Sequence, residues 1–116
     1  MKAVTYQGHK NMEVREVNDT TIEESTDAII KITASGICGS DLHLYHQGDL
    51  FMDPGFVIGH EPMGIVEEVG KDVKTLKKGD RVVIPFNIGC GDCFYCNNHM
   101  ESQCDNSNPS PANWKM

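Results

Sequence analysis

The chain has 116 residues, a formal net charge of −7 at pH 7, and 39% hydrophobic residues. This length suits one domain with a modest core and is too short for two ordinary domains. The excess of acidic residues argues against nucleic acid or an anionic membrane as a partner. The apolar runs are far shorter than the roughly 20 residues of a membrane span, and the N-terminus lacks the apolar core of a signal peptide. We therefore expect a cytoplasmic protein without a membrane partner.

Short segments rich in β-branched residues, separated by glycine-containing turns, dominate the chain. Such segments are typical of half-buried strands. The expected strands are Lys2–Tyr6, Met12–Val17, Ala28–Ala34 and Arg81–Ile84. Because helical periodicity is scarce, this pattern indicates a mainly β fold, a small barrel or sandwich.

The segment Phe56–Gly70 is also strand-like, but glycine and proline interrupt it. We expect a bulge or sharp bend where His60 and Glu61 lie. Between these strands, a short helix capped by Ser40 or Asp41 and stopped by Gly48 is predicted. Loops are expected over Asp49–Gly55 and over the tail that follows Cys104.

Four of the five cysteines lie close together, with the spacing C-x2-C-x2-C-x7-C; they are Cys90, Cys93, Cys96 and Cys104. Two intervening residues allow a tight turn to bring successive sulfurs to one centre. Four thiolates complete the tetrahedral coordination of zinc and leave no position for a substrate, so a structural zinc site is predicted over about residues 89–104. The alternatives are a pair of disulfides or an iron–sulfur cluster. Zinc is favoured because nothing else in the sequence suggests an oxidising compartment.

The fifth cysteine, Cys38, lies in a glycine-rich turn after an expected strand, and His60 and Glu61 lie in a second glycine-flanked segment. A thiolate and an imidazole from separate turns can share a second zinc, which three protein ligands and a water would make catalytic. The alternative is a buried structural cysteine and a hydrogen-bonded histidine. From spacing alone both interpretations stay open.

Four motifs, taken together, resemble the zinc-dependent alcohol dehydrogenases of the medium-chain dehydrogenase/reductase family. They occur in that family's order and spacing. The motifs are Gly36–His43, Gly59–Val66 with Val69–Gly70, Lys78–Val82 and Cys90–Cys104. The resemblance implies a GroES-like β-barrel with a cysteine-rich zinc lobe and short helices, which forms the N-terminal part of the family's catalytic domain.

The resemblance also implies roles for individual residues. Cys38 and His60 would be ligands of the catalytic zinc, and Glu61 would lie beside the metal as an occasional ligand. Ser40 would accept the proton of the substrate hydroxyl, and His43 would pass it towards solvent. Asp41 would hydrogen-bond the free nitrogen of His60 and fix its tautomer. The four clustered cysteines would bind the structural zinc. The other histidines, His9, His46 and His99, are predicted to be surface residues, with His46 a candidate for the substrate mouth.

Two departures from the family pattern shape what we expect of this chain. The family's third catalytic zinc ligand comes from beyond residue 116, so Glu61, water or a neighbouring chain would have to complete the set. No Gly-x-Gly-x-x-Gly fingerprint of a dinucleotide-binding domain occurs. We therefore expect residues 1–116 to be an incomplete, truncated GroES-like domain that binds zinc but is inactive alone.

In the full-length enzyme, the resemblance implies hydride exchange between a small alcohol or aldehyde and NAD(P), in a homo-oligomer. Gly39 stands where some members carry a basic residue near the cofactor phosphates, which favours bacterial relatives acting on polyols, threonine, small alcohols or aldehydes. The alternative is a stand-alone zinc-binding module with a structural or interaction role. Against that alternative stands one set of residues, because a structural module has no use for a proton relay: Cys38, Ser40, Asp41, His43, His60 and Glu61.

Overall fold

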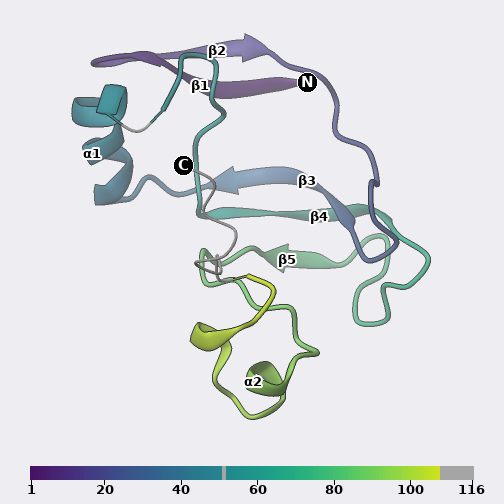
Figure 1. The fold of residues 1–116 in the computed structure, drawn as a ribbon. Coiled ribbons are helices and arrows are strands. Elements are labelled where there is room, and N and C mark those ends of the chain that lie inside the picture. Colours follow the sequence, from purple (N-terminus) through teal and green to yellow (C-terminus); the bar gives the residue numbers. More distant parts are fainter. Residues whose placement is uncertain (51, 108–116) are drawn as a thin grey trace. The chain divides into compact units, whose positions relative to one another are not determined.

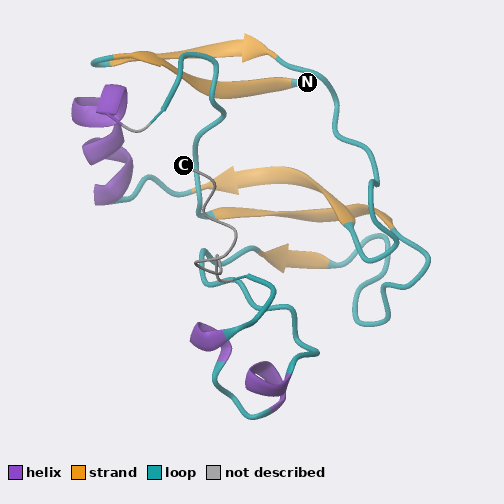
Figure 2. Cartoon of the chain, viewed as in Figure 1, coloured by secondary structure: helices purple, strands orange, loops and turns teal. Residues whose placement is uncertain are grey.

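A computed structural model describes residues 1–50 and 52–107 of the chain (Figure 1). The strands and short helices follow one another in this order: β1 Lys2–Gly8, β2 Asn11–Glu16, β3 Ala28–Ser35, α1 Gly39–Gln47, η1 Gly48–Leu50, β4 Pro62–Val69, β5 Arg81–Val83, α2 Phe94–Asn97 and η2 Glu101–Gln103. Strands account for most of this regular structure (Figure 2), which confirms the predicted mainly β class. No helix in the described ranges is long and apolar enough to cross a bilayer.

The strands belong to two antiparallel sheets. β1 and β2 form a hairpin in which Val4 faces Val14, and Lys10 in its turn has a positive φ of 55°. The other sheet has the order β3-β4-β5, with irregular register on both sides of the Ile30–Ile32 stretch of β3. β1, β2, β3 and β5 lie where the sequence predicted strands, within two residues at either end, and β4 occupies the second half of the predicted segment Phe56–Gly70.

The core of this part of the chain is small and centres on Tyr6 and Val66, both completely buried. Gly48 explains part of the burial of Tyr6, because the tyrosine ring occupies the space where a Cβ of residue 48 would lie, with Cε2 at 2.6 Å. Helix α1 ends before Gly48 as predicted, but for another reason. The glycine has an ordinary helical φ of −62° and continues into η1, so close packing rather than a left-handed cap explains it.

Three local expectations are corrected by the structure. Helix α1 begins at Gly39, with Cys38 as its N-cap, two or three residues before the predicted caps Ser40 and Asp41. The stretch before His60 is not a strand, since Val57 makes only an isolated bridge to Thr5. β4 begins at Pro62, which is permitted because the first residue of a strand need not donate a ladder hydrogen bond. The predicted loop at Asp49–Gly55 begins instead with the last residues of the 3-10 helix η1. Residue 51 of that loop and residues 108–116 of the predicted tail loop lie outside the described residues.

Contacts divide the chain into two compact units, Met1–Ile84 and Pro85–Met116. The second unit holds the clustered cysteines together with α2 and η2, two short helices whose bounds the sequence did not predict. Among its described residues, 85–107, the buried ones are Cys96 and Cys104. A unit of this size with so small an apolar core depends on another stabilising element, which in natural small folds is a disulfide or a metal ion.

Candidate metal centres

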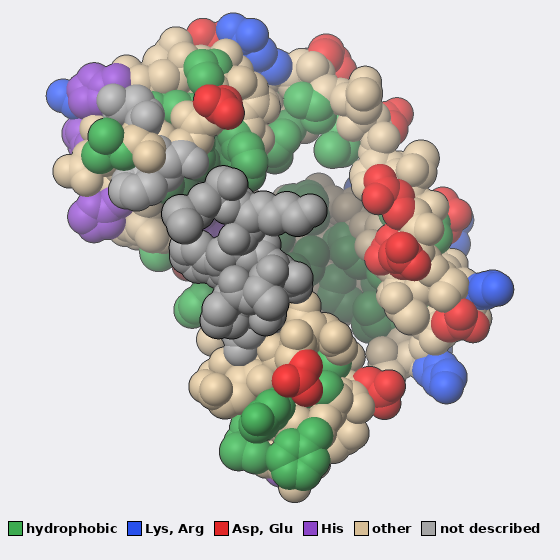
Figure 3. Space-filling view, in the orientation of Figure 1, with side chains coloured by type: hydrophobic (Ala, Val, Ile, Leu, Met, Phe, Trp, Pro, Cys, Tyr) green, Lys and Arg blue, Asp and Glu red, His purple; other side chains and the backbone are tan. Residues whose placement is uncertain are grey.

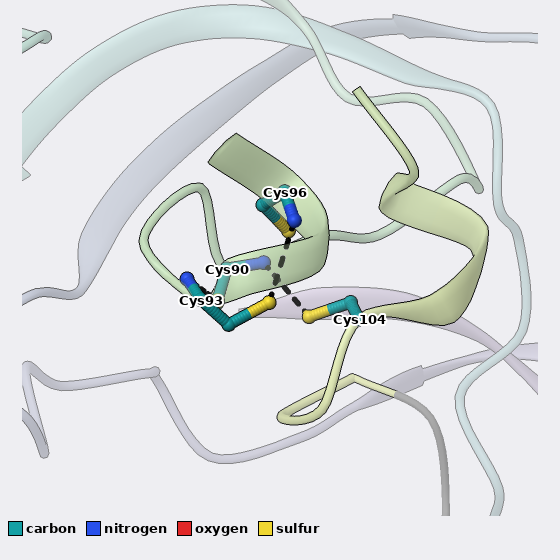
Figure 4. A group of neighbouring side chains, drawn as sticks. All are labelled: Cys90, Cys93, Cys96 and Cys104. Atoms are coloured by element: carbon teal, nitrogen blue, oxygen red, sulfur yellow. Dashed lines mark hydrogen bonds between the residues drawn. The ribbon is translucent and has the colours of Figure 1, made fainter. Parts of the chain in front are cut away.

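The four cysteines of the second unit converge on one point (Figure 4). The sulfurs of Cys90, Cys93, Cys96 and Cys104 all lie within 4.8 Å of one another. Around a tetrahedral zinc with Zn–S bonds of about 2.3 Å, sulfurs lie about 3.8 Å apart. All four cysteines are free thiols in the structure, and this arrangement of sulfurs fits a zinc ion.

Backbone amides point at the sulfurs and would stabilise them as thiolates. The amide of Cys93 donates to the sulfur of Cys90 (3.4 Å), and the amide of Cys96 donates to the sulfur of Cys93 (3.5 Å). The amide of Cys90 closes the group by donating to the sulfur of Cys104, at 3.3 Å. The two-residue spacing produces the first two of these bonds, because Cys93 and Cys96 each turn the amide towards the sulfur three residues before it. Tight turns therefore build the site locally.

The pKa values of two of these thiols, Cys96 and Cys104, are shifted in opposite directions. Hydrogen bonds from Ser107 and from the amide of Cys90 lower the pKa of Cys104 to about 5. The amide of Gly91 acts to lower the pKa of Cys96, but burial and the neighbouring thiols outweigh it and raise that pKa to about 12. At neutral pH the metal-free cluster therefore carries a thiolate at Cys104 and a protonated thiol at Cys96.

We expect zinc binding by this cluster at pH 7 to release fewer than four protons, because Cys104 has already lost its proton. Affinity should rise with pH, since zinc competes with protons for the sulfurs. The slope of log affinity against pH should steepen as the pH falls below about 5, where Cys104 becomes protonated as well. Calorimetry in two buffers of different ionisation enthalpy counts the released protons, and release of all four at pH 7 would contradict the low pKa.

A second group of possible metal ligands lies in the first unit. Cys38, His60 and Glu61 each place one ligand atom within 4.8 Å of the others. Cys38 and His60 are half-buried, whereas Glu61 is exposed. The N-cap of α1 supplies the cysteine, and the turn that leads into β4 supplies the other two residues. A sulfur, an imidazole and a carboxylate are the donors of catalytic zinc sites that keep an open position.

Asp41 connects the two parts of this second group. Its Oδ2 accepts a hydrogen bond from the amide of Cys38 (2.8 Å), and its Oδ1 lies 3.2 Å from Nδ1 of His60. Asp41 is only 8% exposed, and the Cys38 amide satisfies its Oδ2. Its buried Oδ1 makes no hydrogen bond within the described residues and lies at ion-pair distance from His60. With Nδ1 facing Asp41, Nε2 of His60 is the nitrogen available to a metal.

Ser40 lies on the opposite side of the imidazole. Its Oγ donates to the sulfur of Cys38 (3.3 Å) and lies 3.2 Å from Nε2 of His60. The Ser40 hydroxyl lowers the pKa of the Cys38 thiol, and the Cys38 sulfur in turn raises the pKa of His60. Both shifts act in the direction of a thiolate beside an imidazolium, and a protonated imidazole must lose its proton before it can bind a metal.

The remaining histidines lie at the surface. His43 is exposed on α1, one turn beyond Ser40, and no hydrogen bond joins these two within the described residues. His9, His46 and His99 are exposed, as predicted. Histidine side chains gather over α1 in the space-filling view (Figure 3).

Sequence reasoning missed two residues that act on the ligands. Ser107 approaches Cys104, with its amide 3.4 Å from the sulfur, and its hydroxyl donates to the carbonyl of Ile88 (2.8 Å). Gly36 lies against the carboxylate of Glu61. Neither has a spacing signal of its own, because each acts through a contact that exists only after the chain has folded.

A mainly β unit that carries a cysteine–histidine–carboxylate group is followed along the chain by a unit that carries a four-cysteine cluster. The family model described as the alcohol dehydrogenase GroES-like domain matches residues 24–113. The chain belongs to this family, which confirms the predicted fold class. The match includes residues of both compact units, and the prediction that they form one domain stays a prediction.

Individual relatives carry related names. The zinc-type alcohol dehydrogenase-like protein AdhB of Bacillus subtilis (strain 168) is 66% identical over 108 residues, which are 93% of this chain and 29% of that protein. The formaldehyde dismutase of Pseudomonas putida is 36% identical over 115 residues, 95% of this chain and 29% of that protein. Among solved structures, the alcohol dehydrogenase TADH of Thermus sp. ATN1 superposes with a TM-score of 0.82 at 45% identity, covering 90% of this chain and 30% of that chain. This chain thus spans less than a third of the length of each of these relatives.

Proposed function

We propose that this chain supplies the zinc-holding part of a zinc-dependent alcohol dehydrogenase. The observation that carries the proposal is the convergence of Cys38, His60 and Glu61, with Ser40 within hydrogen-bonding distance of the first two. A purely structural site would have no reason to place an exposed hydroxyl beside an incomplete set of ligands. Family membership supports the same class of reaction, oxidoreduction of an alcohol or aldehyde.

The two clusters would have different tasks. Cys90, Cys93, Cys96 and Cys104 would hold a structural zinc, because four sulfurs complete its coordination. Cys38, His60 and Glu61 would hold the catalytic zinc. A zinc ion with an open position acts as a Lewis acid and lowers the pKa of a coordinated hydroxyl group.

The side chains around the second cluster would move and hold protons. Ser40 would accept the proton of the substrate hydroxyl, because its Oγ already lies among the ligand atoms. His43 would pass that proton to solvent, since it is exposed one helical turn further along α1. Asp41 would keep the proton of His60 on Nδ1 and so leave Nε2 free for the metal.

The longer enzyme would exchange hydride between a small alcohol or aldehyde and NAD(P). The relative named formaldehyde dismutase supports small aldehydes as one substrate class. We place the protein in the cytoplasm, because five free cysteines, four of them clustered, suit a reducing compartment. A homo-oligomer is supported by large apolar side chains that remain exposed on the first unit, among them Val14 at 67% and Ile37 at 84%.

A second candidate function is a stand-alone zinc-binding module. The observation in its favour is that the four-cysteine cluster is complete within its own compact unit and does not need the second cluster. In that case Cys38 and His60 would be hydrogen-bonded structural residues without a metal. The zinc stoichiometry described in the Discussion separates the two functions.

A chimaera tests the catalytic proposal. Residues 1–107 of this chain would replace the matching segment of the Thermus alcohol dehydrogenase, to which this chain is 45% identical. We expect NAD(P)-linked oxidation of alcohol by the chimaera, and a loss of about 10²–10⁴-fold in kcat on Ser40→Ala, the usual contribution of a positioned proton-transfer group.

The matched control is Ser35→Ala, which removes an exposed hydroxyl that, among the described residues, donates to the neighbouring carbonyl of Gly36. It should leave the rate unchanged. A folded, zinc-loaded chimaera that oxidises no alcohol, or equal rates for the Ser40 variant and its parent, would refute the proposed roles.

A further inference from the structure

Gly36 lies between the end of β3 and the N-cap of α1, two residues before Cys38. Its amide donates a hydrogen bond to the carbonyl of Glu61 at 3.1 Å. The backbone that leads to the cysteine ligand and the backbone that carries the carboxylate are therefore held against each other at this point.

Gly36 is also the place where the side chain of Glu61 folds back. A Cβ at residue 36 would overlap Oε2 of Glu61, and would lie 3.3 Å from its Cβ and 3.4 Å from its Cδ. Every residue except glycine has such a Cβ, so every substitution competes with the carboxylate for this space. Because the overlapping atom is the end of a flexible side chain, the carboxylate can swing away without unfolding the protein.

The position of that carboxylate decides whether the second cluster has three ligand groups or two. Cys38 and His60 provide a sulfur and a nitrogen, and the carboxylate of Glu61 completes the set within 4.8 Å. Three protein ligands are the number found in catalytic zinc sites. A displaced carboxylate would leave two, which bind zinc far more weakly.

We propose that Gly36 is a positioning residue for metal binding, and that it acts by leaving space for the carboxylate of Glu61 beside Cys38 and His60. This inference rests on the proposed function, since it assumes that the second cluster binds a metal. It goes beyond that function because it assigns control of metal affinity to glycine, a residue without a functional group. The packing of one side chain against a bare backbone then controls the affinity of the site.

The test is a zinc titration of the full 116-residue chain, with a chromophoric chelator as competitor, that measures the affinity of the weaker site. Four proteins form a double-mutant cycle: the parent, Gly36→Ala, Glu61→Ala and the double variant. Gly39→Ala is the control, since a Cβ there meets nothing within 4 Å and residue 39 lies on the other side of Cys38. Cobalt(II) loading gives a second measurement, because its visible spectrum reports the coordination of the metal.

We expect Gly36→Ala and Glu61→Ala each to weaken the second zinc by about 10- to 100-fold, the loss typical of a disturbed ligand environment. The double variant should be no weaker than Glu61→Ala alone, with the same cobalt spectrum, because the clashing carboxylate is gone. If Gly36→Ala fails to fold, recovery of the fold in the double variant supports the same steric conflict.

Three results would overturn the inference: an unchanged affinity in Gly36→Ala, additive losses in the double variant, or no effect of Glu61→Ala. In each of these cases the parent still binds a second zinc, and the proposed function stands. A parent chain without a second zinc site would refute the proposed function and this inference together.

Discussion

Replacing Cys93 by alanine is expected to unfold the second unit and to make it sensitive to proteases. The buried side chains among its described residues, Cys96 and Cys104, both belong to the cluster itself. Structural zinc contributes on the order of 10 kcal/mol to the folding of small domains, and a three-sulfur site forfeits much of it. Limited proteolysis with mass spectrometry should show new cleavages confined to residues after Ile84, where the unit boundary lies.

Cys38→Ala is the matched control for this experiment, since it also removes a thiol but lies in the first unit. Its second unit should resist proteolysis as the parent does. Treatment of the parent with a strong chelator should reproduce the cleavages of the Cys93 variant, because both remove the metal. Equal thermal stability of the Cys93 variant and the parent in chelator-free buffer would show that the cluster does not stabilise the fold through a metal.

The metal content of the parent is expected to be about two zinc ions per chain, and Cys38→Ala should lower it to about one. The two clusters have different donors and different exposure, so they should also differ in strength. The four-sulfur cluster has two buried members, whereas Glu61 in the second cluster is exposed. The zinc ion lost on Cys38→Ala should therefore be the more weakly bound one, and mild chelation of the parent should remove it first.

Elemental analysis after gel filtration gives the stoichiometry directly. Its control is Cys93→Ala, which should lose the tightly bound ion instead. About one tightly bound zinc in the parent, unchanged by Cys38→Ala, would favour the stand-alone module over the dehydrogenase. Zinc-free protein with the clustered sulfurs joined as disulfides would refute both functions.

Local sequence signals predicted the elements of the fold well. The alternation of β-branched residues located β1, β2, β3 and β5, because a half-buried strand needs that period whatever it packs against. The segment before β4 was wrongly predicted as a strand. Val57 there pairs with Thr5 as a single bridge, and the extent of such pairing depends on a distant partner that no local pattern reveals.

The predicted start of α1 illustrates a subtler error. Ser40 and Asp41 are good N-caps by type, yet Cys38 takes that position and Asp41 lies at the third helical residue. There its carboxylate accepts a hydrogen bond from the Cys38 amide and also faces His60. The contact between Asp41 and His60, 19 positions further along the chain, accompanies a position of Asp41 inside the helix. Local preference alone would have placed Asp41 at the N-cap.

The sequence alone determined which atoms were available to bind metal, and it determined the four-cysteine cluster almost completely. Two-residue spacings force neighbouring sulfurs into one turn, so local geometry suffices there. Only the tertiary structure decided that Cys38, His60 and Glu61 form a group, because β3 and β4 must pair before their ends can meet. The space beside Gly36 was likewise invisible in the sequence, since an absent side chain matters only when another chain segment fills its place.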